Sequence, residues 1–306
     1  MSVRPEGTAR AVVAALVAAS TAIASCSAAP TPTVKPTSSA PTAEASAASP
    51  GPTAGPPSAQ SSAAPASPEP TAAASPGLRP YLDIATIEDP QFAGYVVGPG
   101  SFSTVTMRWI EPSVTCPARS DSGGRASSVG IWAGIQDAIS HLEQAGTVVT
   151  CTSSGVATHR AFWEAYPLRA TFFPIRSAPG HRMYARVEAR GSGWSYLVKD
   201  LSTGAIASAS HTGAPVAALY AEWLVERGLC LGSLTKLCML PSFVPVVVLA
   251  ASMTVVGARP SGITGRWPAA QPLPIERIQM FEGIGGLATT SSLRGTSSAF
   301  SVSRVP

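Results

Sequence analysis

The chain carries carboxyl and carboxamide side chains inside stretches that are otherwise apolar. Gln144 stands in "HLEQAGT" at residues 141–147, and Glu226 stands in "AEWLVERG" at residues 221–228. Burying a carboxylate costs free energy unless the group is paired or protonated, so such a residue needs partners or a function. A carboxyl group among aromatic side chains has a raised pKa, which suits a base that later acts as an acid. These two residues are the first candidates for chemistry.

Three further residues share this placement: Gln136, Glu164 and Glu222. Each candidate also has a purely structural interpretation. Gln144 could satisfy backbone groups at a sheet edge. Glu226 could form an ion pair with Arg227 or another arginine, and a paired structural acid at Glu164 would look the same as a substrate-binding one. The residues alone leave these alternatives open.

Several common catalytic patterns are absent from the sequence. It contains no G-x-S-x-G, no H-E-x-x-H, no phosphate-binding P-loop and no G-x-G-x-x-G after a strand. Asparagine does not occur, which excludes a Cys-His-Asn arrangement. The histidines His141, His159, His181 and His211 are scattered, and we expect them at the surface or in turns. No metal or cofactor is expected.

The elements that must position these side chains are strands. Four segments alternate apolar and polar residues, as half-buried strands do; they span residues 102–112, 182–191, 193–204 and 299–305. Three others are more continuously apolar, as expected of strands packed on both faces; they span residues 127–135, 146–152 and 243–257. The last is too short for a transmembrane helix.

Helical periodicity extends over few residues, and residues 214–228 come nearest to it. Within them we nevertheless expect "AEWLVE" to be a strand, because Trp223 and Val225 alternate with Glu222, Leu224 and Glu226. Short strands separated by glycine-rich turns predict an all-β fold, an antiparallel two-sheet β-sandwich.

The N-terminal part has the sequence of segments that is typical of an exported protein. Residues 1–25 read as a signal peptide, with arginines before a short apolar run, and "IASC" ends in Cys26 as a lipoprotein box does. Ordinary cleavage nearby is the alternative. Residues 26–80 form a Pro/Ala/Ser/Thr-rich tether that cannot bury a core. The six Trp, six Tyr and eight Phe all follow it, so residues 81–306 are the folded domain.

These features place the protein at the extracellular face of the membrane as a lipoprotein, or in the medium as a secreted protein. The net charge of +4 shows no basic cluster, which argues against a nucleic-acid partner. Four cysteines follow Cys26, and in an exported protein three disulfide pairings are possible. The short spacing of Cys230 and Cys238 favours a closed loop, which leaves Cys116 with Cys151. A zinc site made of the four is the competing view.

Eight segments resemble, in order, the glutamic peptidases (eqolisins), secreted acid proteases with a double-sheet β-sandwich of the jelly-roll or concanavalin-like type. They are "FAGYVV", "TMRWIEPSVTC", "VGIWAGIQD", "LEQAGT", "AFWEAYP", "VKDLSTG", "AEWLVERG" and the apolar strand after it. The resemblance covers roughly residues 90 to 305. It implies that Gln144 and Glu226 are the catalytic pair, on neighbouring strands of one sheet.

The resemblance further implies that Trp132, Gln136, Glu164 and Tyr166 line a substrate groove. The implied reaction is metal-independent hydrolysis of a polypeptide: Glu226 takes a proton from a water held also by Gln144, and this water attacks the scissile carbonyl. The protein would act as a monomeric endopeptidase, anchored through its N-terminal lipid. The rival hypothesis is a non-catalytic lectin-like or adhesive β-sandwich displayed on the cell surface, since sandwiches host many functions.

Overall fold

A computed structural model describes residues 84–117, 127–138, 141–213, 218–229, 236–264, 273–294 and 298–306. The predicted signal peptide, Cys26 and the predicted tether lie outside these ranges, so their assignments remain predictions. All regular elements of the described residues are β-strands. Within the same ranges, no apolar helix is long enough to cross a bilayer.

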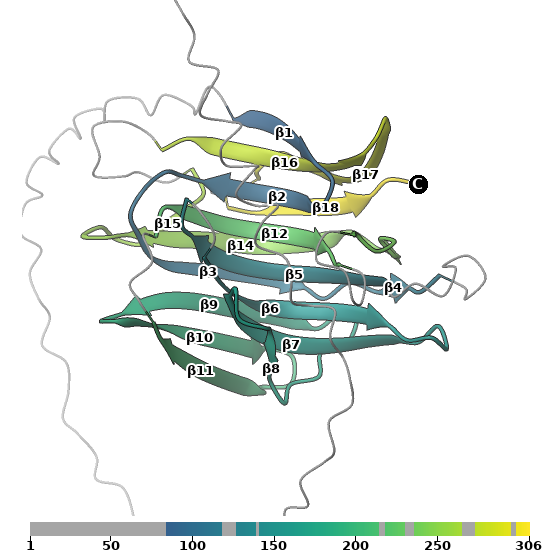
Figure 1. Cartoon of the computed structure of the whole chain (residues 1–306), viewed down its shortest axis with the longest axis horizontal. Coiled ribbons are helices and arrows are strands. Elements are labelled where there is room, and N and C mark those ends of the chain that lie inside the picture. The colour runs from purple at the N-terminus through teal and green to yellow at the C-terminus, as the bar shows by residue number, and fades with distance from the viewer. Residues whose placement is uncertain are drawn as a thin grey trace, which may run out of the picture. The chain divides into compact units, whose positions relative to one another are not determined.

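The strands form two layers that pack face to face (Figure 1). The front layer contains, in spatial order, β16 (Ile275–Glu282), β2 (Phe92–Val97), β12 (Tyr220–Arg227), β5 (Ser127–Gln136), β6 (Leu142–Cys151), β7 (Ala157–Tyr166) and β8 (Thr171–Phe172). The back layer contains β11 (Ile206–Thr212), β10 (Gly193–Asp200), β9 (Arg182–Arg190), β3 (Phe102–Ile110), β14 (Val246–Val255) and β18 (Phe300–Arg304).

The two layers belong to one hydrogen-bonded path. β17 (Gly285–Thr290) lies between β16 and β18 and carries the path from front to back, and every pairing along it is antiparallel. Two further strands pair with this path: β1 (Ala85–Asp89) lies parallel to β16, and β15 (Ser261–Gly262) lies beside β14. A separate two-stranded sheet contains β4 (Val114–Thr115) and β13 (Ser242–Phe243). The expected antiparallel sandwich is confirmed, with a continuous ladder in place of two separate sheets.

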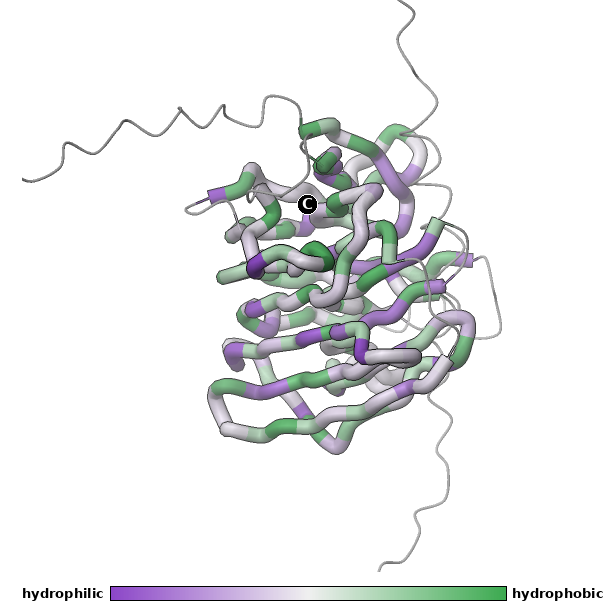
Figure 2. The backbone as a smooth tube through the Cα atoms, turned by 90° about the vertical axis from the view of Figure 1, so that its left-hand side faces the viewer, coloured by the Kyte–Doolittle hydropathy of each residue, from purple (hydrophilic) through white to green (hydrophobic). Residues whose placement is uncertain are grey.

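Most of the expected strands are present. Hydrophobic and hydrophilic positions alternate along many of them (Figure 2). β3, β9, β10 and β18 are half-buried strands as predicted, and every position of β5 is buried, as its apolar sequence requires. β6 begins at Leu142 and is therefore longer than predicted.

The prediction for residues 243–257 is wrong in one respect. β14 is buried on one face only, and Val247 and Leu249 on its other face are 37% and 36% exposed. An apolar run cannot distinguish a doubly covered strand from a strand of an outer layer that keeps valines and leucines on its open side.

The front layer buries side chains on both faces. Ala221, Trp223 and Val225 of β12 pack into the core between the layers. Leu224 points to the opposite face and joins a second cluster with Phe92, Trp132 and other apolar residues. We call this second face of the front layer the site face. The alternation predicted for "AEWLVE" is confirmed, and it sends Glu222 and Glu226 to the site face with Leu224.

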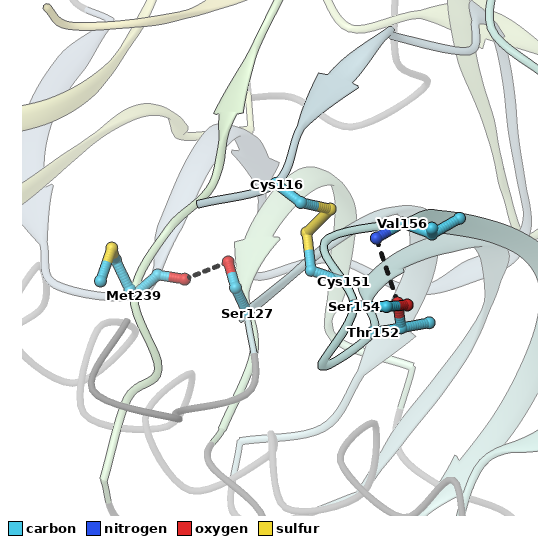
Figure 3. The surroundings of a disulfide bond; sticks show 7 residues. All are labelled: Cys116, Ser127, Cys151, Thr152, Ser154, Val156 and Met239. Carbon is cyan, nitrogen blue, oxygen red and sulfur yellow. Dashed lines mark hydrogen bonds between the residues drawn. A yellow bond between two sulfur atoms is a disulfide. The ribbon is translucent and has the colours of Figure 1, made fainter. Parts of the chain in front are cut away.

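A disulfide joins Cys116, after β4, to Cys151 at the end of β6, with their Cα atoms 5.5 Å apart (Figure 3). Near it, the hydroxyl of Ser127 donates to the carbonyl oxygen of Met239 over 2.8 Å. The predicted Cys116–Cys151 pairing is confirmed, and a zinc site made of all four cysteines is excluded. Cys238 is also disulfide-bonded, whereas Cys230 lies outside the described residues.

The prediction of surface histidines is wrong for His159. This residue is 8% exposed, and its Nδ1 lies 2.8 Å from Oε1 of Glu111. The other carboxylate oxygen of Glu111 accepts hydrogen bonds from the side chains of Trp109 and Thr147. Burial is possible because the carboxylate satisfies the imidazole, and sequence alone does not reveal a partner 48 positions away.

Candidate active site

The strand register places Gln144 in a row of polar residues on the site face. Gln144 of β6 is paired with Glu164 of β7 on one side and with Gly134 of β5 on the other. Gly134 is paired in turn with Glu222 of β12. Residues paired across adjacent strands project to the same face, so Gln144, Glu164 and Glu222 share the site face. Gly134 contributes no side chain between them.

Glu226 lies on the same face, further along β12. The expectation that Gln144 and Glu226 lie on neighbouring strands is wrong, because β5 pairs with both β6 and β12 and lies between them. Its carboxylate accepts hydrogen bonds from Nε1 of Trp132 over 2.8 Å and from Nε2 of Gln91 over 3.2 Å. The residue is 1% exposed. These donors come from β5 and from the residue before β2, the two neighbours of β12 in the sheet. Such donors stabilise a negative charge that burial would otherwise disfavour.

Gln144 and Glu164 are joined directly. The carboxamide nitrogen of Gln144 donates to Oε2 of Glu164 over 2.7 Å. Oε1 of each side chain is buried without a hydrogen-bond partner in the described residues. Burial raises the pKa of Glu164 well above its ordinary value, the charge of Glu226 raises it further, and the bond from Gln144 opposes these effects. Glu226 is therefore within electrostatic reach of the Gln144–Glu164 pair.

The four residues predicted to line a groove also belong to this face. Trp132 and Gln136 project from β5 on the side of Gly134, while Glu164 and Tyr166 project from β7. Trp132, Gln136 and Glu164 are almost fully buried, and Tyr166 is partly exposed. Nε2 of Gln136 is a buried donor with no partner in the described ranges. The register thus gathers all six predicted residues on one face.

The structural alternative for Glu226 can be compared with these contacts. Arg227, the next residue, forms an ion pair with Glu282 at 3.1 Å and donates from Nε to the carbonyl oxygen of Cys238. Adjacent residues of a strand point to opposite faces, which separates this arginine from the site face. The structural alternative predicted an ion pair between Glu226 and Arg227. Arg227 instead pairs with Glu282.

Sequence reasoning missed Gln91. It touches Glu226 from 135 positions away, and no pattern around it distinguishes it from a surface glutamine. Only the pairing of β2 with β12, which sets Phe92 against Glu226, brings it to the site. Among the described residues, no group of His, Cys, Asp and Glu has the arrangement of a metal site.

Comparisons with known proteins identify the family and the fold of the chain. Residues 90–297 match the model of the Peptidase A4 family. No curated protein sequence is significantly similar to the chain. Scytalido-glutamic peptidase, solved with a peptide-based transition-state analogue, is 20% identical with a TM-score of 0.58. SCP-B, an eqolisin solved with the tripeptide Ala-Ile-His, is 18% identical with a TM-score of 0.56. Each alignment covers 71% of this chain and 98% of the other.

At these identities the structural likeness shows a shared fold, and the family match carries the assignment. That match spans residues 90–297 of the 306 and includes all six residues discussed above. The chain belongs to the Peptidase A4 family, the glutamic peptidases or eqolisins.

Proposed function

We propose that this glutamic peptidase is an acid endopeptidase in which Gln144 and Glu226 activate a water for direct attack on the peptide bond. The observation that carries the proposal is the position of both side chains on one face of the front layer, with Glu226 held by Trp132 and Gln91. A carboxylate with fixed donors and a carboxamide on the same face supply the base and the oxyanion donor that metal-independent hydrolysis requires.

In the proposed reaction, the Glu226 carboxylate removes a proton from the water as the water oxygen bonds to the scissile carbonyl carbon. Negative charge then develops on the carbonyl oxygen, and Nε2 of Gln144 donates a hydrogen bond to it. Its other hydrogen remains bonded to Glu164, which fixes the orientation of the amide. Protonated Glu226 donates to the leaving nitrogen as the C–N bond breaks, and the carboxylate is restored.

The substrate proposed for the site is an extended polypeptide. Scytalido-glutamic peptidase and SCP-B share the fold and bind a peptide-based analogue and a tripeptide. In this chain, Trp132, Gln136, Glu164 and Tyr166 share the site face with the pair, and we assign them to substrate binding. Tyr166 is the partly exposed member of this set, and we assign it the direct contact with the substrate.

The test is hydrolysis of a denatured protein between about pH 2 and 5. Glu226→Gln should lower kcat/KM by about a thousandfold or more because the base is lost. Gln144→Ala should lower it by about a hundred- to a thousandfold because an oxyanion donor is lost. Glu282→Gln is the control: this carboxyl group is 59% exposed on β16 and should be dispensable.

Both variants should keep the circular dichroism spectrum of the wild type. Equal activity in wild type, Glu226→Gln and Gln144→Ala would refute the catalytic pair. A folded wild-type protein that binds glycans and cleaves no protein would favour the adhesive β-sandwich.

A further inference from the structure

Glu222 has no part in the reaction described above, although it shares the site face with the proposed catalytic residues. Its cross-strand row runs from Glu276 of β16 through Val96 of β2 to Glu222, and continues across Gly134 to Gln144. Glu222 and Glu226 occupy the same strand and the same face. The fold thus places a second carboxyl group of β12 in direct register with Gln144.

Glu222 differs from the other acids of the site face in its partners. Glu226 accepts bonds from Trp132 and Gln91, and Glu164 accepts one from Gln144. Glu222 is 0% exposed, and neither of its oxygens has a hydrogen-bond partner in the described part of the chain. A buried carboxylate without donors is strongly disfavoured, whereas a neutral carboxyl group is tolerated at much lower cost.

The charged groups near Glu222 also favour its neutral form. Burial raises its pKa well above the ordinary value, and the carboxyl groups of Glu276 and Glu226 raise it further. Besides Glu226, the titratable neighbour of Glu222 on β12 is Tyr220. The charges of Glu222 and Glu276 both raise the pKa of Tyr220. The flanking strands contribute residues without charge, which are Val96 and Gly94 from β2 and Gly134, Trp132 and Gln136 from β5. No cation is among the groups that shift its pKa.

We propose that Glu222 must be uncharged for catalysis and that its ionisation sets the upper pH limit of proteolysis by this site. The inference rests on the proposed function and names a residue that acts through Glu226 and Gln144. The transition state places negative charge on the substrate oxygen beside Gln144, while Glu226 begins the cycle as an anion. A further carboxylate, buried and unscreened, would oppose both.

The experiment is the pH profile of kcat and kcat/KM for the wild type and Glu222→Gln. Glutamine has nearly the same shape and never ionises. It should therefore keep activity within about threefold at the optimum and move the alkaline limb upward by about one pH unit or more. The control is Glu188→Gln, an acid of β9 in the back layer that pairs with Arg186 and Arg190. Its alkaline limb should match that of the wild type.

A second variant keeps the test decisive if Glu222→Gln does not fold. Glu276 is 8% exposed, and its charge raises the pKa of Glu222. Removing that charge in Glu276→Gln should let Glu222 ionise at lower pH, so the alkaline limb should move downward. Opposite shifts in the two variants are a signature that a purely structural role for Glu222 would not produce.

The outcomes separate this inference from the proposed function. An active wild type that depends on Glu226 and Gln144, but has the same alkaline limb as folded Glu222→Gln, overturns the role of Glu222 alone. A folded Glu222→Gln that is inactive at every pH also overturns it, because an uncharged side chain should suffice. An unchanged limb in Glu276→Gln counts against it equally. A folded wild-type protein that cleaves no protein in acid would refute the proposed function, and with it the role of Glu222.

Discussion

At the scale of single residues, the site is defined by which carboxyl group receives hydrogen bonds. Trp132 and Gln91 donate to Glu226, Gln144 donates to Glu164, and Glu222 has no donor within the described residues. Three chemically identical side chains on one face therefore have different surroundings, and burial raises the pKa of both Glu164 and Glu222 well above its ordinary value. The donor from Trp132 joins an aromatic side chain to the proposed base and explains why a tryptophan is placed there.

Trp132→Phe tests this bond. Phenylalanine retains much of the ring but has no N–H group, so the proposed base loses one donor. A hydrogen bond to a charged group contributes about 1.5–3 kcal/mol, so kcat/KM should fall about ten- to a hundredfold. The smaller ring also leaves a cavity in the buried cluster of the site face, so Tm should fall. In the control Trp223→Phe, the lost indole donor serves the carbonyl oxygen of Thr106 in the core between the layers. That variant should also lose stability but keep kcat/KM, and full activity in Trp132→Phe would contradict the assignment.

At this scale most residues of the proposed site could be predicted from the sequence. Gln144, Glu164 and Glu226 could be singled out because acids and amides in apolar strands are costly, and the order of the motifs supplied their family. Gln91 could not be found, because its contact with Glu226 depends on the register of β2 against β12. His159 was misplaced for the same reason, since its partner Glu111 is remote in sequence.

At the scale of elements, the positions of Trp132 and Gln144 depend on the close approach of β5 and β6. A Cβ atom at Gly146 would lie 2.0 Å from the carbonyl oxygen of Ile131 and 2.7 Å from Cα of Trp132. Real atoms do not approach so closely, so any side chain there must separate the strands. Gly146 is paired with Trp132 and lies one alternation from Gln144, so the spacing of the two strands bears directly on the site.

Gly146→Ala should consequently cost at least about 3 kcal/mol in the free energy of unfolding, because the clash involves backbone atoms that cannot rotate away. Gly285→Ala in β17 is the control, since its nearest atom would be 3.7 Å from the new Cβ and the cost should be within about 1 kcal/mol. Urea denaturation followed by circular dichroism measures both values. Equal stability of the two variants would show that β5 and β6 can separate without penalty.

The strands themselves were largely predictable, because alternation and glycine-rich turns are local signals. Their pairing was not. The strand prediction for "AEWLVE" came from alternation against a competing helical period, and β12 confirms it. The exposure of Val247 and Leu249 on β14 could not be predicted, because it depends on what covers the back layer. Neither could the continuous ladder through β17, since long-range pairing leaves no mark on local sequence.

At the scale of the whole molecule, the described residues contain an unusual number of buried acids whose pKa is raised. Burial raises the pKa of Glu143 to about 7 and that of Glu276 to about 7. The pKa values of Glu164 and Glu222 are raised as well, again chiefly by burial. All of these groups bind protons more tightly in the folded domain than in the unfolded chain.

The domain should accordingly be most stable in acid. The folded-state pKa of each such group exceeds its unfolded value, so its contribution is complete below about pH 4.5 and is lost as the pH rises towards 7 and beyond. The raised pKa of Glu143 alone corresponds to about 3 kcal/mol over this window. Urea denaturation at a series of pH values should show this decline, with a shallower slope in Glu143→Gln. A free energy of unfolding that increases steadily from pH 4 to 7 would contradict it.

The parallel pairing of β1 with β16 has a practical consequence. Oδ1 of Asp89, at the end of β1, accepts the backbone N–H groups of Gln91 and Phe92, and the side chain of Gln91 reaches Glu226. The turn that follows β1 thus contacts the proposed base through Gln91. A recombinant fragment starting at Phe92 would omit that turn and leave Glu226 with one fewer donor, so the boundary for producing the isolated domain belongs upstream of Ala85.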